Sequence, residues 1–133
     1  MQRLLTRSDF QAVLAGKLLV KTAHFALHAR WLDSPLPVQS IGAMVPKRWA
    51  KRAVTRNTIK RQIYTMSAEY ASGLPIQAYV LRLRAGFDRA MFVSATSDAL
   101  KLAIRTELNT LFALALERSK LPEASRLPQR LAS

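Results

Sequence analysis

The basic stretch from Lys47 to Arg61 constrains the fold of this chain more than any other feature of its sequence. Seven of its fifteen residues are Lys or Arg and none is acidic, so the stretch repels itself unless a polyanion neutralises it. An apolar stripe at helical spacing continues from it, formed by Ile59, Ile63, Met66 and Tyr70. The pattern predicts one helix, from about Trp49 to Ser72, whose second half packs on a core and whose first half presents cations to solvent.

The overall charge favours an anionic partner. Lys and Arg number 21 against 8 Asp and Glu, which gives a formal net charge of +13 and an isoelectric point near 11.3. The length of 133 residues is typical of one compact domain. The chain has no cysteine, no signal-peptide pattern and no apolar run near the roughly 20 residues of a membrane span. We therefore expect a cytoplasmic protein with no membrane partner.

Hydrophobic periodicity predicts three helices and four strands. Ser8, with Gln11 three residues later, is typical of a capping box at the start of a short helix that ends before Gly16. Thr96 or Ser97 can cap the last helix, which has a long apolar stripe. Alternating or continuous apolar runs predict strands at Leu18–Thr22, His24–Leu32, Ser40–Val45 and Ile76–Leu83.

The predicted order is helix, strand, strand, strand, helix, strand, helix. Separated helices and a few mixed strands are typical of a two-layer α+β sandwich, here with a four-stranded sheet. Pro122 ends the last helical pattern, so residues 1–119 are expected to form one RNA-binding domain and residues 120–133 a flexible tail.

The sequence offers no side chains arranged for catalysis. His24 and His28 fall on one predicted strand, roughly 13 Å apart, which is too far to share a metal ion. Strand histidines that face solvent or a groove are the simpler interpretation. The eight acidic residues are scattered and form no pair suited to acid–base work or to a two-metal site. Because glycine-rich phosphate loops and hydrolase elbows are also missing from the sequence, we expect no catalytic residue and no metal ligand.

The basic stretch is predicted to bind nucleic acid. The alternative, a solvated helix face, is weak because no Asp or Glu alternates with the cations. Arg offers a planar fork to phosphate, Lys a flexible point charge, and the amide of Asn57 both donates and accepts hydrogen bonds. Such contacts position a ligand without reading its sequence. Trp49 lies among these cations, where it could stack on RNA or pack at the helix start.

The stretch resembles the signature of the bacterial ribonuclease P protein component, which centres on Arg-Asn-Arg followed by an apolar residue and Lys-Arg. Here Lys47-Arg48 and Lys51-Arg52-Ala53 precede Arg56-Asn57-Thr58-Ile59-Lys60-Arg61. The likeness continues, in the same order, at Ser8-Asp9-Phe10, Phe25, Leu27, Ile41-Gly42 and Tyr79-Val80-Leu81. It covers roughly residues 1–118.

The resemblance implies a fold of four strands and three helices, like that of the second domain of ribosomal protein S5. It also implies that the basic helix crosses between parallel strands in the left-handed sense, although about 98% of such connections are right-handed. The implied function is to assist the catalytic RNA of ribonuclease P, which removes the 5′ leader from precursor tRNA. Mg²⁺ bound by the RNA then carries the catalysis, and one protein copy is expected in the holoenzyme.

The resemblance assigns two groups of residues. The catalytic RNA is expected to contact Lys47, Arg48, Lys51, Arg52, Arg56, Asn57, Lys60 and Arg61. A groove between the first helix and the sheet is expected to hold the single-stranded leader with Phe10, Leu14, His28, Lys60 and Tyr64. For Phe10 and Leu14, plain core packing is an equally good interpretation.

Four positions depart from the family pattern. Thr58 stands where Arg is usual, which predicts one weaker phosphate contact. Leu14 and His28 stand where aromatic residues are frequent, so base stacking is expected to be reduced or taken over by His28. Tyr64 replaces a common basic residue.

Two other functions are compatible with the charge. A ribosome-associated basic protein could bind structured RNA without any enzyme complex, and a DNA-binding protein could place the basic helix in a groove. A helix-turn-helix needs a second helix just before the basic one, whereas Ser40–Val45 is predicted to be a strand. Neither alternative accounts for Arg56-Asn57 between that strand and the apolar stripe of a helix.

Overall fold

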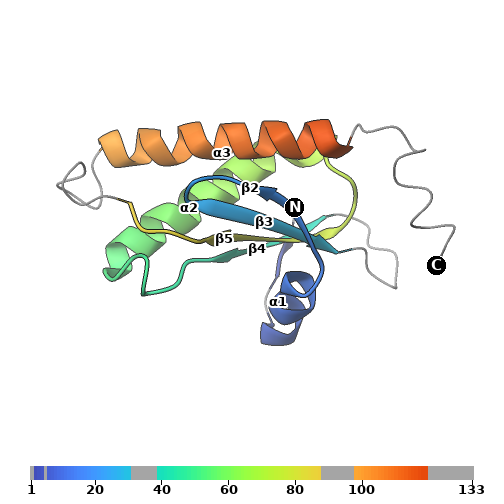
Figure 1. Cartoon of the computed structure of the whole chain (residues 1–133), viewed down its shortest axis with the longest axis horizontal. Helices are drawn as coiled ribbons and strands as arrows, with labels where there is room; N and C mark the ends of the chain where they lie inside the picture. The colour runs from blue at the N-terminus through green and yellow to red at the C-terminus, as the bar shows by residue number, and fades with distance from the viewer. Residues whose placement is uncertain (1, 5, 31–38, 88–97, 120–133) are drawn as a thin grey trace, which may run out of the picture.

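A mixed five-stranded sheet carries two helices, α2 and α3, on one face and the short helix α1 on the other (Figure 1). The computed structural model describes residues 2–4, 6–30, 39–87 and 98–119. The elements are β1 (Gln2–Arg3), α1 (Arg7–Leu14), β2 (Lys17–Lys21), β3 (Phe25–Arg30), β4 (Ser40–Met44), α2 (Ala53–Tyr70), a 3₁₀ turn (Ala71–Gly73), β5 (Ala78–Leu83) and α3 (Asp98–Ser119).

The spatial order of the strands is β1-β4-β5-β3-β2. Strands β1, β4 and β5 are parallel neighbours, and β3 runs antiparallel to both β5 and β2. All seven predicted elements occur in the predicted order, but the prediction of four strands was wrong. The fifth strand, β1, has two residues, which is too short to leave a periodic signal. It exists because Gln2 and Arg3 pair with Ser40 and Ile41 at the edge of β4.

The two faces of the sheet build two unequal cores. The larger lies under α2 and α3, where β5 contributes Tyr79 and Leu81 and α2 contributes Ile59 and Ile63, all buried. The smaller lies under α1 and centres on Val13, Ala78 and Val80, with partly buried Leu4, Phe10, Leu14 and Met44 around it. The two-layer description therefore fits the sheet with α2 and α3, and α1 adds a partial third layer.

The start of α1 differs from the prediction. Thr6, not Ser8, is the N-cap, because its Oγ1 accepts a hydrogen bond of 3.1 Å from the backbone N–H of Asp9. Ser8 instead lies inside the first turn. The helix does end before Gly16, but not through a left-handed residue, since no described glycine has positive φ. At Gly16 a β-carbon would lie 2.9 Å from the carbonyl oxygen of Ala29, so glycine allows the chain to pass close to β3.

Several predictions concern segments outside the described residues. They are the cap at Thr96 or Ser97, residues 31 and 32 of the strand predicted at His24–Leu32, and the tail at 120–133. The last described helix, α3, ends at Ser119, next to the predicted domain boundary.

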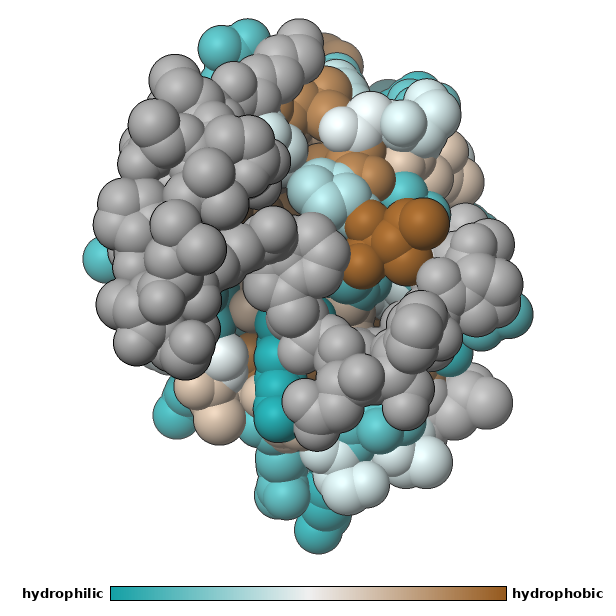
Figure 2. Space-filling model, turned by 90° about the vertical axis from the view of Figure 1, so that its right-hand side faces the viewer, coloured by the Kyte–Doolittle hydropathy of each residue, from teal (hydrophilic) through white to brown (hydrophobic). Residues whose placement is uncertain are grey.

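Exposed apolar side chains are scattered over the described surface. The large ones are Leu18, Trp49, Val54, Ile76, Leu102 and Leu114. At the end of the molecule shown in Figure 2, hydrophobic residues appear as separate patches among hydrophilic ones. Hydrophilic residues gather at the lower end of that view, the level at which α1 lies in Figure 1. Among the described residues, no helix is both long enough and apolar enough to cross a membrane.

Candidate nucleic-acid interface

The basic stretch consists of a loop followed by a helix. The prediction that the helix begins near Trp49 was wrong, because α2 begins at Ala53. The carbonyl oxygen of Pro46 accepts hydrogen bonds of 3.1 Å from both Trp49 and Ala50, which closes a separate turn. Lys47, Arg48 and Lys51 therefore lie on a loop, and Arg52 occupies the N-cap position.

Arg56 joins this loop to the helix. It continues the buried stripe of Ile59 and Ile63 toward the N-terminus, and it is partly buried. Its Nη1 donates to the carbonyl oxygens of Ala50 at 3.0 Å and Lys51 at 2.8 Å. The guanidinium therefore holds the loop against the first turn of α2, while its other N–H groups make no hydrogen bond within the described part of the chain.

The remaining predicted contacts to the catalytic RNA are exposed, namely Lys47, Arg48, Lys51, Arg52, Asn57, Lys60 and Arg61. None of the basic residues among them forms a salt bridge within the described residues. The first turn of α2 has no acidic residue, and Arg52 makes no side-chain capping bond. Cations at a helix N-terminus oppose the helix dipole. We call the surface made by these seven residues and Arg56 the basic surface; it has the unneutralised positive potential that attracts phosphates.

Two residues within this stretch differ in accessibility. Thr58 is buried, and its Oγ1 donates to the carbonyl oxygen of Val54 at 2.9 Å, so its hydroxyl is used inside the helix. Trp49 is 37% exposed, and the guanidinium carbon of Arg48 lies 5.2 Å from the centre of its ring. Trp49 thus adds an aromatic surface to the basic loop.

Phe10 lies directly on the backbone of β4. A β-carbon at Gly42 would collide with the ring of Phe10, so glycine at this position lets the ring approach the strand. Phe10 and Leu14 are partly buried, whereas Val13 between them is almost completely buried. Phe10 therefore belongs to the smaller core and still presents part of its ring to solvent.

Tyr64 reaches β4 from α2. Its hydroxyl oxygen accepts a hydrogen bond of 3.1 Å from the backbone N–H of Ala43, the residue after Gly42. The guanidinium carbon of Arg3 lies 4.0 Å from the centre of the Tyr64 ring. Tyr64 packs against the larger core and Phe10 belongs to the smaller one, so the two side chains reach β4 from opposite faces of the sheet, at successive residues. Lys60 lies one helical turn before Tyr64. Arg3 was not predicted here, because β1 left no signal in the sequence.

His28 does not present its ring to the groove. It is 8% exposed, and its Nε2 accepts a hydrogen bond of 3.0 Å from Nε of Arg82. Nδ1 is buried without a partner among the described residues. Burial, and then the charge of Arg82, lower the pKa of His28. In this position His28 cannot take over base stacking. Arg82 is a residue that the sequence analysis did not assign to the site, although a lone Arg on the apolar face of a predicted strand was a signal.

His24 lies before β3, not within it, and belongs to a structural cluster. One carboxylate oxygen of Glu107 accepts from Oγ1 of Thr22 at 2.5 Å and from the backbone N–H of His24 at 2.6 Å. The other lies 2.7 Å from Nδ1 of His24, whose ring stacks on Phe87 at 4.0 Å. The prediction that His24 is a strand histidine facing solvent or a groove was therefore wrong.

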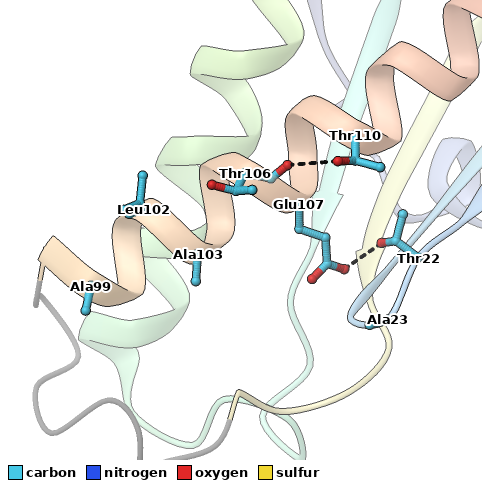
Figure 3. A pocket seen from close by; sticks show the side chains of 8 residues that line it. All are labelled: Thr22, Ala23, Ala99, Leu102, Ala103, Thr106, Glu107 and Thr110. Carbon is cyan, nitrogen blue, oxygen red and sulfur yellow. Dashed lines mark hydrogen bonds between the residues drawn. The ribbon is translucent and has the colours of Figure 1, made fainter.

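A hollow of about 590 Å³ opens beside Glu107 (Figure 3). It is lined by Thr22, Ala23, Ala99, Leu102, Ala103, Thr106, Glu107 and Thr110. Its walls are mostly apolar or hydroxyl-bearing. The carboxylate of Glu107 already accepts hydrogen bonds from the β2–β3 turn. No group of three or more possible metal ligands occurs among the described residues.

Comparison with known proteins gives one consistent result. Residues 1–107 match the family model described as Ribonuclease P. The ribonuclease P protein component of Bordetella parapertussis is 36% identical over 114 residues, which cover 83% of this chain and 88% of that relative. The one from Ralstonia pickettii is 33% identical over 130 residues, which cover 98% and 90%.

Solved structures show a similar fold. The RNase P protein of Staphylococcus aureus superposes with a TM-score of 0.68 at 22% identity, over 86% of this chain and 95% of that one. The RNase P protein of Thermotoga maritima superposes with a TM-score of 0.61 at 21% identity, over 85% and 97%.

Proposed function

This chain belongs to the bacterial ribonuclease P protein family and is therefore a component of a tRNA-processing endoribonuclease that contains RNA. We propose that it binds two different RNA ligands through two different surfaces. The basic surface binds the catalytic RNA. The groove between α1 and the sheet receives the single-stranded 5′ leader of precursor tRNA. Family membership supports this function over that of a ribosome-associated protein outside any enzyme complex.

The observation that supports the first assignment is the unneutralised charge of the basic surface. Most of its cations lie on the loop before α2, at its N-cap or in its first turns, and those nearest the N-terminus oppose the helix dipole. None of the cations pairs with a carboxylate among the described residues. Such an arrangement reduces the stability of the free protein and is compensated when phosphates bind. Phosphate contacts made this way position the RNA without reading its bases.

The second assignment rests on Phe10 and its surroundings. Its ring lies on the backbone of Gly42 and is partly exposed. Tyr64 reaches the same strand from α2, on the other face of the sheet, and Lys60 lies one helical turn before it. A second aromatic ring is therefore found at this strand, with a cation one turn away along the helix. Single-stranded nucleic acid is commonly bound by stacking on aromatic rings beside positive charge. The leader of precursor tRNA is the single-stranded part of the substrate.

Catalysis is assigned to Mg²⁺ held by the RNA subunit. The chain has only eight acidic residues, scattered along the sequence, against 21 Lys and Arg, and a protein of this charge is suited to binding RNA. We propose that one copy binds each catalytic RNA, in the cytoplasm.

Reconstitution tests this function. The protein is added to its cognate catalytic RNA with precursor tRNA at low Mg²⁺, where a positively charged subunit should increase leader cleavage. Protein free of RNA should not cut at any Mg²⁺ concentration. No gain in cleavage from the added protein, or correct 5′ cleavage by protein alone, would contradict the proposal.

Phe10→Ala tests the groove, with Val13→Ala as the matched control in the same small core. If Phe10 stacks on a base, its loss should reduce the preference for leader-bearing over mature tRNA by about 1–3 kcal/mol. Val13→Ala should lower the melting temperature and leave this preference unchanged. If both variants lose stability and neither changes leader preference, Phe10 is a core residue and the groove assignment is wrong.

A further inference from the structure

Arg82 occupies an unusual position for a cation. It lies in β5 and is partly buried. Its side chain is on the same face of the sheet as Ala78 and Val80, the face that α1 covers. Its Nε donates to the neutral acceptor Nε2 of His28. No carboxylate contacts it in the described part of the chain. Transferring a cation away from water is costly unless an anion accompanies it, so this guanidinium lacks the partner that its environment favours.

The contact with His28 orients Arg82. Nε donates to the imidazole, which leaves the edge of the planar guanidinium formed by the two terminal nitrogens for another acceptor. They make no hydrogen bond with any described residue. This pair of nitrogens is the fork that binds phosphate oxygens in a bidentate manner. His28 is itself buried, so the side chains packed around it restrict movement of its ring.

The register of the sheet places Arg82 next to the proposed leader groove. Val80 pairs with Gly42, on which the ring of Phe10 lies. Arg82 pairs with Met44, two residues further along β4. Two residues of a strand span roughly 7 Å. A single-stranded RNA whose base stacks on Phe10 and whose backbone follows β5 thus brings a neighbouring phosphate toward Arg82.

We propose that Arg82 binds a phosphodiester of the single-stranded 5′ leader, and that His28 acts as a positioning residue that holds the guanidinium for this contact. The inference rests on the proposed function and deepens it. It assigns the groove a phosphate contact on the sheet itself, in addition to the cations of α2. It also gives His28 a role that does not need an exposed ring.

The experiment uses the holoenzyme reconstituted from the protein and its cognate catalytic RNA. Precursor tRNAs carrying leaders of increasing length are bound to enzyme with Arg82→Met, which keeps an unbranched apolar stem and removes the guanidinium group with its charge. Affinity should fall about tenfold for the longer leaders, and affinity for mature tRNA should not change. Arg105→Met, an exposed arginine on α3, is the control for loss of one charge and should have no leader-dependent effect.

Two further measurements separate phosphate binding from a structural role. A series of leaders, each with one methylphosphonate linkage, removes one phosphate charge at a time. Wild-type enzyme should lose affinity at one linkage, and the Arg82→Met enzyme should be insensitive to that same substitution. His28→Gln, which keeps an acceptor, should retain more leader affinity than His28→Phe, which does not. Melting temperatures of the four variants show whether any loss reflects unfolding.

The outcomes distinguish this inference from the function on which it rests. A wild-type holoenzyme with no preference for a leader would overturn the groove assignment and the role of Arg82 together. A normal wild-type preference that Arg82→Met leaves intact would overturn only the role of Arg82. Equal losses with mature and leader-bearing tRNA would also overturn it, because the effect would not depend on the leader.

Discussion

Arginines that look equivalent in the sequence differ in their exposure and hydrogen-bond partners in the structure. Arg61 is exposed, Arg56 ties the basic loop to α2, and Arg82 is held by His28. Arg84 donates to the carbonyl oxygens of Thr22 and Ala23 in the β2–β3 turn. The residue type supplies the fork of donors, and the neighbouring carbonyls or imidazole decide how many of those donors remain for RNA.

Arg56→Lys is predicted to weaken binding of the catalytic RNA although the charge is kept. A lysine cannot hold two loop carbonyls in the fixed geometry of the guanidinium, so the loop that carries Lys51 should lose its order. We expect a loss of about 1–2 kcal/mol in RNA affinity, measured by equilibrium binding. Arg61→Lys is the control, and a loss equal to that of Arg56→Lys would mean that the loop bonds are unimportant.

His28 is predicted to make the stability of the protein depend on pH. Its folded-state pKa is lowered below the ordinary value of 6.5, first by burial and then by Arg82. The unfolded chain therefore binds a proton more readily than the native protein, and the free energy of unfolding should fall as the pH drops below 6.5 toward the lowered pKa. Denaturant unfolding between about pH 7.5 and pH 5.5 measures this.

The matched variant for this pH prediction is His28→Gln, which removes the titrating group and keeps a polar side chain. Its free energy of unfolding should vary less with pH over the same range. A slope equal to that of the wild-type protein would show that other groups, and not His28, are responsible.

At the scale of elements, α3 is attached to the sheet by more than its apolar stripe. Glu107 accepts hydrogen bonds from Thr22 and from the backbone of His24, and its other oxygen contacts the His24 ring. These contacts join α3 to the turn between β2 and β3, two parts of the chain more than eighty residues apart. The carboxylate thereby satisfies a backbone donor that the sheet leaves unpaired.

Glu107→Ala is predicted to lower the stability of the protein by about 2 kcal/mol, because it leaves a partly buried turn without its acceptor. Thermal or denaturant unfolding measures the loss. Glu117→Ala, an exposed acid on the same helix, is the control and should change stability little. Binding of the catalytic RNA should be unaffected in both variants, and a selective RNA-binding defect in Glu107→Ala would place this turn at the RNA interface.

At the scale of the whole molecule, the two proposed surfaces meet along α2. The basic loop and the first turns of α2 make the basic surface, and the same helix brings the hydroxyl of Tyr64 to β4, the strand on which the ring of Phe10 lies. One rigid helix packed on the larger core therefore fixes the distance between the two surfaces. Such an arrangement would hold the catalytic RNA and the leader at a fixed distance and orientation relative to each other.

Binding of the catalytic RNA is predicted to weaken steeply with salt. If the basic surface neutralises about five phosphates, the slope of log affinity against log salt should be roughly −3.5 to −4.5. Equilibrium binding over a range of KCl concentrations measures it. Lys60→Ala should make the slope less steep by the contribution of about one phosphate contact. A slope near zero in the wild-type protein would exclude the basic surface as the binding site.

The sequence alone was sufficient for the type and order of the seven periodic elements, although not for the residue at which each begins. In the strand predicted at Ile76–Leu83, Tyr79 and Leu81 pack in one core and Ala78 and Val80 in the other, because successive side chains of a strand point to opposite faces. The stripe of Ile59, Ile63 and Met66 correctly predicted the buried face of α2. The family signature was recognisable for the same reason, since its residues lie close together in the chain.

Tertiary structure decided which polar side chains are free. His28 meets Arg82 across 54 residues and Arg84 meets Thr22 across 62, and neither separation leaves a periodic signal. Strand β1 exists only because β4 offers an unpaired edge, and α2 begins late because Pro46 and Arg56 engage the loop before it. These contacts depend on where the chain returns in space, which is set by packing of the whole domain and not by neighbouring residues.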